Sequence, residues 1–299
     1  MRNSVPLVSI AIITKNRPIK LKRCLLSLKK QSFKLFTIII VDNDDIQSAL
    51  PITQDKLFNK LKIKYYHLPQ KTVPACRNSA MKSNKNPYLA FIDDDCVADK
   101  NWLKKALEKI FNTKSKYVLG KTKLLNFHNI FAIAQHARDN FWKEYNGQLL
   151  DTKNLLIDAN FFKNKKLKFD EKCQSSHYDS ADFDLDFQIK KAGIRGTYTP
   201  KMLVYHEETD SLTRFKRRAF HRGKLAKYLN EKWQLNHALV NLKDQCLIHF
   251  LLRVMKNFVN DYQRYKKHME TNSFFKKFFA TCLIKNFERH YLLGYVAKN

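Results

Sequence analysis

The stretch Tyr88-Leu89-Ala90-Phe91-Ile92-Asp93-Asp94-Asp95 decides how this chain of 299 residues is interpreted. Five residues of mostly apolar, strand-like character run directly into three consecutive carboxylates. Adjacent carboxylates repel one another, and none of the three lies where it would help a helix N-terminus. Carboxylate oxygens are the hard ligands that Mg²⁺ and Mn²⁺ prefer, often together with substrate phosphates. The stretch therefore indicates a metal–phosphate site, and the alternative is an acidic turn between a strand and the next helix.

Short apolar runs alternate with helical patterns before and up to this stretch. Apolar, β-branched runs predict buried strands, and apolar residues at helical spacing predict helices. The predicted strands are 8–13, 36–41, 63–67 and 88–92, and the predicted helices are 21–31, 57–61 and 74–83. This β-α-β-α-β-α-β order predicts an α/β fold with a doubly wound, mainly parallel sheet and helices on both faces.

Polar side chains follow three of the predicted strands. In open α/β sheets, ligands bind beyond the carboxyl ends of the strands. The three groups are Thr14/Asn16/Arg17, Asp42/Asn43/Asp44 and Asp93/Asp94/Asp95. Acidic groups at two strand ends and a basic one at the third suit a nucleotide with its metal. The chain contains neither G-x-G-x-x-G nor a P-loop pattern, so the usual dinucleotide and P-loop sites are unsupported.

The middle of the chain holds a second acidic group. Residues 180–189 open an amphipathic helix that ends near Gly193, a good stop signal. Ser180 or Asp182 would cap this helix, and acids in its first turn suit the helix dipole. Asp184 and Asp186 therefore have a structural explanation as well as a functional one.

A lone histidine, His206, follows a short predicted strand at 202–205. A histidine in this position is more often structural than a ligand. It becomes a candidate metal ligand only if the fold brings it close to the acidic stretch 93–95.

The chain is strongly basic, and the basic residues concentrate in its last part. Lys and Arg number 56 against 27 Asp and Glu, which gives a net charge of +29. Residues 212–299 contain 19 basic and 5 acidic residues, a net +14, so their positive charge is about twice as dense as that of residues 1–211. Such a surface suits phosphates, nucleic acid or an anionic membrane. The alternative is a general richness in lysine that keeps the protein in solution.

Two apolar stripes at helical spacing occupy this tail, at 247–259 and 274–287. An apolar stripe with a basic opposite face fits a helix that lies in a membrane interface. The alternative is that the stripes pack on each other or on the rest of the protein. For the Phe-rich second stripe we favour the membrane interpretation over this packing. We expect a catalytic domain at 1–211 and a basic helical extension at 212–299 that docks on a membrane surface or a partner.

The six cysteines are scattered, and no pair has C-x-x-C spacing. Scattered cysteines argue against a disulfide framework or a zinc site and favour reduced thiols in the cytosol. We expect a cytoplasmic protein that docks peripherally on the inner face of the cell membrane.

The acidic stretch 93–95 and the acidic helix start at 180–189 occur together in one chain. In this combination the chain resembles glycosyltransferase family 2, the inverting nucleotide-sugar enzymes with the GT-A fold. The similarity covers about residues 8–206 and rests on motifs that are weak singly and specific in their order. The motifs are the strand 8–13 with Thr14-Lys15-Asn16-Arg17-Pro18, then Ile39-Ile40-Val41-Asp42-Asn43, Cys76-Arg77-Asn78, Phe91-Ile92-Asp93-Asp94-Asp95, Trp102-Leu103, Asn160, Phe169-Asp170-Glu171, Asp182-Phe183-Asp184-Leu185, Lys191-Ala192-Gly193 and Val204-Tyr205-His206.

The resemblance implies roles for the donor side of the site. Asp42 would contact the base or ribose, and the residues lining the nucleotide pocket would include Thr14, Asn16, Arg17, Arg77 and Asp94. Asp93 and Asp95 would stand at the ends of a D-x-D motif that binds ribose and a divalent cation, Mn²⁺ or Mg²⁺. His206 would be a further metal ligand.

The resemblance also implies roles for the acceptor side. Asp182 matches the acid of the family's Glu-Asp pair and would be the catalytic base, with Asn160 and Asp184 beside the acceptor. Ala181 replaces the usual Glu before the base, so Asp179 and Asp184 stay open as alternatives. Lys15 stands where an aromatic residue is common, and the glycines usual near the Arg-Asn motif are missing.

The implied activity is metal-dependent transfer of a sugar, with inversion, from a nucleoside-diphosphate sugar to a hydroxyl. The acceptor would be a glycan or a lipid-linked precursor in surface polysaccharide or lipopolysaccharide assembly. One alternative is a basic nucleic-acid-binding protein, but no recognisable nucleic-acid motif supports that partner. The other alternative is a relative without activity, motivated by Ala181.

Overall fold

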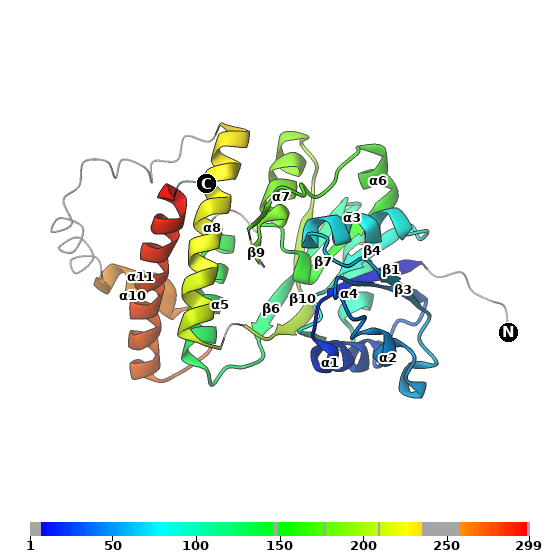
Figure 1. The fold of residues 1–299 in the computed structure, drawn as a ribbon, viewed down its shortest axis with the longest axis horizontal. Coiled ribbons are helices and arrows are strands. Elements are labelled where there is room, and N and C mark those ends of the chain that lie inside the picture. The colour runs from blue at the N-terminus through cyan, green and yellow to red at the C-terminus, as the bar shows by residue number, and fades with distance from the viewer. Residues whose placement is uncertain (1–6, 146–148, 176–177, 209, 235–257, 298–299) are drawn as a thin grey trace. The chain divides into compact units, whose positions relative to one another are not determined.

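The structure, a computed structural model, describes residues 7–145, 149–175, 178–208, 210–234 and 258–297 (Figure 1). Its internal contacts divide the chain into two compact units, which are described separately. Unit 1 comprises Met1–Lys123, Leu150–Gln174 and Ala181–His206. Unit 2 comprises Leu124–Leu149, Ser175–Ser180 and Glu207–Asn299.

The division into domains at 1–211 and 212–299 remains a prediction, and the two units group the residues differently. Unit 2 takes in helix α5 (Ile130–Tyr145), because α5 packs against helix α11 (Phe274–Val296) near the end of the chain. Contacts between segments so distant in sequence leave no signal in local composition.

An eight-stranded sheet forms the centre of unit 1, in the order β3-β2-β1-β4-β7-β6-β10-β5. The strands are β1 (Val8–Thr14), β2 (Phe36–Asp42), β3 (Ile63–His67), β4 (Tyr88–Phe91), β5 (Cys96–Ala98), β6 (Tyr117–Leu124), β7 (Leu155–Asp158) and β10 (Thr197–His206). β1 pairs in parallel with β2 and β4, and β2 pairs in parallel with β3. β7 runs antiparallel to β4 and β6, and β10 runs antiparallel to β5. The predicted α/β class is confirmed, with a parallel first half and antiparallel pairs after it.

Helices cover both faces of the parallel strands, as predicted (Figure 1). The helices of unit 1 are α1 (Pro18–Lys29), α2 (Leu50–Thr53), α3 (Val73–Ser83), α4 (Trp102–Thr113), α6 (Ala159–Asn164) and α7 (Ala181–Lys191), with 3₁₀ turns at Lys56–Phe58 and Thr152–Asn154. Alternate residues of β1, such as Ile10 and Ile12, are completely buried in one core with Leu25 of α1 and Trp102 of α4. On the opposite face, α3 packs against β1 and β2.

Two predicted elements of unit 1 differ in extent from the structure. The expected helix at 57–61 is only the 3₁₀ turn Lys56–Phe58. The predicted strand at 202–205 is part of the longer β10 (Thr197–His206). β7 ends at Asp158, because the Asp158 side chain accepts a hydrogen bond from Phe161 N (3.0 Å) and caps α6. A residue with a capping carboxylate favours a helix start over further extension of a strand.

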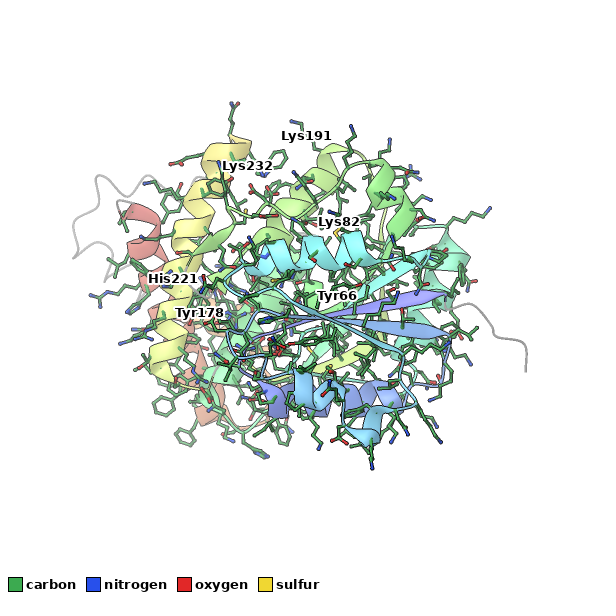
Figure 2. The ribbon with its side chains drawn as sticks, turned by 45° about the vertical axis from the view of Figure 1, so that its right-hand side comes forward. Tyr66, Lys82, Tyr178, Lys191, His221 and Lys232 are labelled. Atoms are coloured by element: carbon green, nitrogen blue, oxygen red, sulfur yellow. The ribbon has the colours of Figure 1, made fainter. Side chains whose placement is uncertain are left out.

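Unit 2 is helical, and its described helices are α5, α8 (Leu212–Trp233), α10 (Phe258–Lys266) and α11. α8 and α11 lie side by side (Figure 1). They approach closely at two glycines, since a Cβ on Gly223 would clash with the backbone of Tyr291 and one on Gly294 with the backbone of Phe220. The short strand β9 (Tyr178–Asp179), which pairs with β8 (Gln174–Ser175), places the Tyr178 ring 5.3 Å from the ring of His221 in a stacked arrangement (Figure 2).

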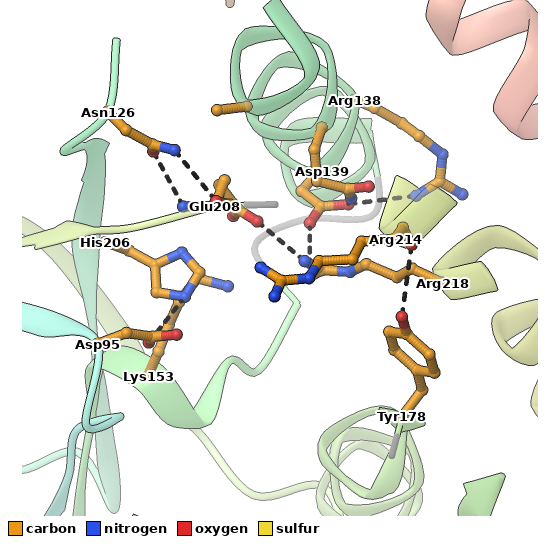
Figure 3. A network of polar contacts seen from close by, with 12 residues as sticks. Asp95, Asn126, Arg138, Asp139, Lys153, Tyr178, His206, Glu208, Arg214 and Arg218 are labelled. Carbon is orange, nitrogen blue, oxygen red and sulfur yellow. Dashed lines mark hydrogen bonds and ion pairs between the residues drawn. The ribbon is translucent and has the colours of Figure 1, made fainter. Parts of the chain in front are cut away.

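A buried ionic cluster joins α5 to α8 within unit 2 (Figure 3). Asp139 lies 2.8 Å from Arg222, 3.2 Å from Arg138 and 3.5 Å from Arg218. Arg218 also pairs with Glu208 at 2.9 Å. Burial would lower the pKa of Arg218, but the charges of Glu208 and Asp139 raise it well above its usual range, so the guanidinium stays charged. A buried arginine of this kind depends on its carboxylate partners.

The tail is helical where the structure describes it, as expected. Residues 247–257 of the first predicted apolar stripe lie outside the described residues. Within the described ranges, we find no helix with the length and apolarity needed to cross a membrane.

Candidate active site

The parallel register brings the three predicted polar strand ends to one edge of the sheet. Thr14 at the end of β1 pairs with Asp42 at the end of β2. Ile92, just after β4, donates its backbone N–H to Ala11 of β1 (3.2 Å). Because the strands run in the same direction, the segments that follow them lie together.

Asp94 lies just after β4 at this edge and is almost completely buried. Thr14 donates its hydroxyl to Asp94 Oδ2 (2.7 Å), and Arg17 donates to Asp94 Oδ1 (3.2 Å). Burial raises the pKa of Asp94 to about 7, and the neighbouring charge of Asp95 acts in the same direction. Thr14 and Arg17 therefore lie beside the acidic stretch, as predicted.

Asp95 lies between a histidine and an arginine. His206 Nε2 is 3.2 Å from Asp95 Oδ1, and the same Arg17 reaches Asp95 Oδ2 at 3.3 Å (Figure 3). β10 pairs antiparallel with β5, and this register sets His206 opposite Cys96, next to Asp95. Burial would raise the pKa of Asp95, but the charge and hydrogen bond of His206 lower it below its usual range. The condition placed on His206, that it lie near the acidic stretch, is met.

The donor set beside His206 fits a divalent cation. Ligand atoms of Asp95, Cys96 and His206 all lie within 4.8 Å of one another. Burial raises the pKa of the Cys96 thiol well above its usual value, so this sulfur stays protonated and is a poor ligand for a hard cation. An oxygen of Asp95 and a nitrogen of His206 are therefore the atoms that fit Mn²⁺ or Mg²⁺.

Asp93 lies at the other end of the acidic triplet and is half-buried. Burial raises the pKa of Asp93, and the positive charge of Arg77 acts against that rise. Arg77 comes from α3, and its guanidinium lies 5.6 Å from the ring centre of Phe169. Arg77 therefore interacts electrostatically with the acidic stretch, and its place in a nucleotide pocket stays a prediction.

Asp42 and Asn16 organise the loops after β2 and β1. Asp42 is completely buried, and its carboxylate accepts hydrogen bonds from Asp44 N (3.0 Å), Ala49 N (3.2 Å) and the Tyr65 hydroxyl (2.9 Å). With its amide oriented to satisfy hydrogen bonding, Asn16 Nδ2 lies 2.6 Å from both carboxylate oxygens of Asp44. Asn16 has φ of 53°, a left-handed conformation that asparagine tolerates better than most residues.

The predicted base and its alternatives differ in burial. Asp182 lies in the first turn of α7, half-buried, and its carboxylate accepts a hydrogen bond from Phe183 N (3.0 Å). Asp184 is completely buried and accepts a hydrogen bond from Gln188 (2.8 Å). Asp179 belongs to unit 2. Of the acids at 182 and 184 in unit 1, Asp182 has the more accessible carboxylate, and a base must reach its substrate.

Two predicted acceptor-side residues lie where an acceptor role is hard to explain. Ala159 N donates to Pro87 O (2.9 Å), ahead of β4, whereas the acidic stretch follows β4, so this geometry gives no support to the acceptor role of Asn160, which stays a prediction. The physical reason is that β7 runs antiparallel to β4. The role of Asp184 stays a prediction, and its complete burial favours a structural function.

The antiparallel strand also brings a residue to the site that the sequence argument missed. The start of β7 lies beside the end of β4, so the preceding turn places Lys153 near Asp95 and His206 (Figure 3). Lys153 is buried, pairs with Asp151 at 2.8 Å, and its charge opposes the rise that burial causes in the pKa of Asp93. In the sequence, the signal available for Lys153 was the acid Asp151 two residues before it, just ahead of a strand. This pattern is not specific for a functional lysine.

Comparison with known proteins identifies the family. Residues 9–169, more than half of the chain, match the family model described as glycosyl transferase family 2. The chain belongs to glycosyl transferase family 2. Family 2 membership confirms the resemblance drawn from the motifs.

This family 2 chain is similar in sequence to a curated relative and similar in fold to two solved structures. It is 28% identical over 123 residues to the succinoglycan biosynthesis protein ExoM of Rhizobium meliloti (strain 1021), a match that spans 40% of each chain. A mannosyltransferase from Pyrobaculum calidifontis in complex with GDP-Man and Mn²⁺ is 11% identical, with a TM-score of 0.62, and the match covers 96% of this chain and 88% of that one. TarS 1-349 of S. aureus in complex with UDP-GlcNAc is 18% identical, with a TM-score of 0.56, covering 96% and 91% of the two chains. These two likenesses show a shared fold, the GT-A fold.

Proposed function

We propose that this chain is a metal-dependent inverting glycosyltransferase that transfers a sugar from a nucleoside-diphosphate sugar to a hydroxyl. The observation that carries the proposal is the pairing of Asp95 with His206 at the carboxyl edge of the parallel strands. An acid–histidine pair in this position, in a family 2 chain, suits a cation and the diphosphate that it would accompany.

The donor side of the site would use the residues gathered around Asp94. Thr14 and Arg17 hold Asp94 in place, and Arg77 offers a further positive charge toward the neighbouring Asp93. Asp42 and Asn16 order the neighbouring loops, where the base and ribose would lie. Neighbours of similar fold are described in complex with UDP, UDP-GlcNAc or GDP-Man with Mn²⁺, which supports a nucleotide-sugar donor.

Asp95 and His206 would hold the divalent cation, with Asp93 at the ribose or metal. When bound, the cation supplies a Lewis acid that neutralises charge on the departing diphosphate. Asp182 would take the proton from the acceptor hydroxyl as that oxygen attacks, a role worth about 10²–10⁴ in rate for a positioned base. Attack from the side opposite the leaving group gives inversion in a single displacement.

We assign the acceptor to the glycans or lipid-linked precursors of polysaccharide assembly, and the enzyme to the cytoplasm or the inner face of the cell membrane. The support is the relative ExoM, which is named for succinoglycan biosynthesis. The matched part is about two fifths of that protein.

A thermal-unfolding screen against UDP, GDP, dTDP and CMP, each with and without Mn²⁺, tests the proposal. A ligand that binds only the native state raises stability by about 2.7 kcal/mol at one hundred times its Kd. We expect stabilisation that needs both Mn²⁺ and one diphosphate, and that disappears in Asp95→Asn. Asp210→Asn removes a surface carboxylate of unit 2 and should respond like the wild type.

Two outcomes would contradict the proposal. Stabilisation by no nucleotide, in a protein shown to be folded, would support a relative without activity. Binding to nucleic acid that weakens steeply with salt and ignores Mn²⁺ would support the alternative of a nucleic-acid-binding protein.

A further inference from the structure

Helix α11 is apolar on two opposite sides, which sets it apart from the other described helices of unit 2. One side is buried in the core of unit 2 through Ala280, Ile284 and Phe287. The opposite side exposes large apolar side chains along the helix: Phe274 (61% exposed), Phe275 (72%), Phe278 (40%), Phe279 (57%), Leu293 (49%) and Val296 (61%). An exposed apolar face opposite a buried one marks a surface that another surface covers in the working state.

The neighbouring helix α8 shows what an outer face in water looks like in this protein. Its exposed residues beyond Leu212 are polar or charged, and they are Thr213, Arg214, Arg217, Glu231 and Lys232. The described outer face of α10 is also mostly polar. The apolar outer face of α11 is therefore a local feature, and a contiguous exposed apolar patch marks an interaction surface.

The four phenylalanines at the start of α11 form one connected aromatic layer. The rings of Phe274 and Phe278 stack with centres 6.5 Å apart, and Phe279 meets Phe278 edge-on at 5.7 Å. Phe275 meets Phe274 edge-on at 5.9 Å. The layer is thus held together before any partner covers it.

A groove of about 590 Å³ adjoins this layer within unit 2. Phe275, Phe279 and Leu283 line it from α11, and Ile130 lines it from the start of α5. Lys216 and Lys276 also line the groove. Cations beside an apolar layer provide the two elements that an interfacial helix needs.

The positions of the lysines are unfavourable for the helix itself. Lys276 and Lys277 lie in the first turns of α11, which contains no acidic residue at its start. Cations near a helix N-terminus oppose the helix dipole, so stability of the isolated helix does not explain them. α11 as a whole has four basic residues and one acidic residue, and α8 has eight and one.

This charge decides between two possible occupants of the face. A second copy of the chain would bring the same basic helices together and would suffer repulsion. A bilayer that contains anionic phospholipid would accept the phenylalanines at its headgroup boundary and attract the surrounding lysines and arginines. We propose that the outer face of α11, with the adjoining groove, docks on an anionic membrane surface.

Vesicle flotation with the full-length protein tests the proposal without donor or metal. The probes are vesicles of phosphatidylcholine alone and vesicles that also contain phosphatidylglycerol. We expect binding to the anionic vesicles that falls as salt rises. In Phe275→Ser/Phe279→Ser the binding constant should fall about tenfold or more, because two exposed rings no longer enter the interface.

Charge reversal gives a second and independent test. Lys276→Glu/Lys277→Glu should also weaken binding about tenfold or more, and acids at this helix start should not harm folding. Lys60→Glu/Lys62→Glu makes the same change in net charge on exposed residues of unit 1 and serves as its control. Phe111→Ser removes an exposed phenylalanine of α4 and is the control for the aromatic variant. Both controls should bind like the wild type.

The proposal is overturned if the wild type does not bind anionic vesicles, or if the Phe275/Phe279 variant binds them unchanged. It is also overturned if the lipid-free protein sediments as a dimer that this variant dissociates, since the face would then contact a second copy. An environment-sensitive label on Cys282, an exposed residue that lines the groove, provides a direct readout in a Cys246→Ser background. Its emission should shift to the blue with anionic vesicles, and no shift would contradict insertion at this face.

Discussion

His206 Nε2 lies 3.2 Å from Asp95 Oδ1, although the two residues come from distant parts of the chain. The antiparallel pairing of β10 with β5 creates this contact, because it sets His206 beside the residue that follows Asp95. The contact links the acidic stretch after β4 to the last strand of unit 1. In the proposed site, an acid and a histidine held in this way would be preorganised as a pair of ligands.

Replacing His206 by alanine should weaken the response to metal more than it weakens the fold. In the proposed site His206→Ala removes one of the two atoms that would bind the cation. The apparent affinity for Mn²⁺ in the presence of a diphosphate should therefore fall at least tenfold, within the range seen for loss of metal-site partners. Titration of Mn²⁺ at saturating nucleotide, followed by thermal unfolding, measures this. His290→Ala in α11 is the control, and an unchanged Mn²⁺ dependence in His206→Ala would contradict a ligand role.

Asp182→Asn should lower the turnover rate about 10²–10⁴-fold, the range expected for loss of a general base. Nucleotide binding should stay near the wild-type value, because Asp182 belongs to the acceptor side of the proposal. Initial rates with the donor identified by the unfolding screen, together with the Kd for the diphosphate, separate the two effects.

Asp184→Asn provides the comparison for this prediction. Asp184 is completely buried, so its substitution should lower the free energy of unfolding before it lowers turnover per folded molecule. Equal turnover in Asp182→Asn and the wild type would exclude Asp182 as the base.

The pKa of Asp94 makes stability depend on pH in a defined direction. Burial raises this pKa to about 7 in the folded protein, from an ordinary value of 3.8. Between pH 4 and pH 7 the folded state therefore holds a proton that the unfolded state has released, so the Asp94 contribution to the unfolding free energy falls as pH rises. Asp94→Asn removes this contribution, and from pH 4 to pH 7 the variant should gain roughly 1–3 kcal/mol relative to the wild type.

Urea unfolding of the metal-free protein at several pH values, with a chelator present, measures this difference. Asp210→Asn on the surface of unit 2 should follow the wild-type curve. Parallel curves for Asp94→Asn and the wild type would show that the Asp94 pKa is close to ordinary.

The parallel half of the sheet and the gathering of polar side chains at its carboxyl edge could be predicted from the sequence. Each strand there is a local apolar run, and each polar group follows its own strand directly, so the pattern of β1, β2 and β4 contains the required information. The register then brings Thr14, Asp42 and Asp94 together without any further assumption.

The antiparallel half could not be predicted in the same way. Hydrophobic periodicity identifies a strand without giving its direction, and β7 runs opposite to β4. The omission of Lys153 follows from this one fact. The closeness of His206 to Asp95 likewise depends on the pairing of β10 with β5, which no local pattern specifies.

Gly294→Ala should destabilise unit 2, although alanine is the better helix former. In the structure a Cβ at position 294 would clash with the backbone of Phe220 in α8. Backbone atoms of a packed helix cannot move aside as a flexible side chain can, so overpacking should cost roughly 1–3 kcal/mol and outweigh the gain in helix propensity of about 1 kcal/mol. Gly223→Ala meets the backbone of Tyr291 and should behave in the same way.

Gly193→Asn is the matched control for these two variants. Gly193 has φ of +64° after α7, where no atom lies within 4 Å of an added Cβ, and asparagine tolerates that conformation. Its cost should therefore be a few tenths of a kcal/mol. Denaturant unfolding measures all three variants, and hydrogen exchange in α8 and α11 locates the loss. A Gly294→Ala protein as stable as the wild type would show that the two helices pack less closely than the structure indicates, because only a wider spacing accommodates the added methyl group.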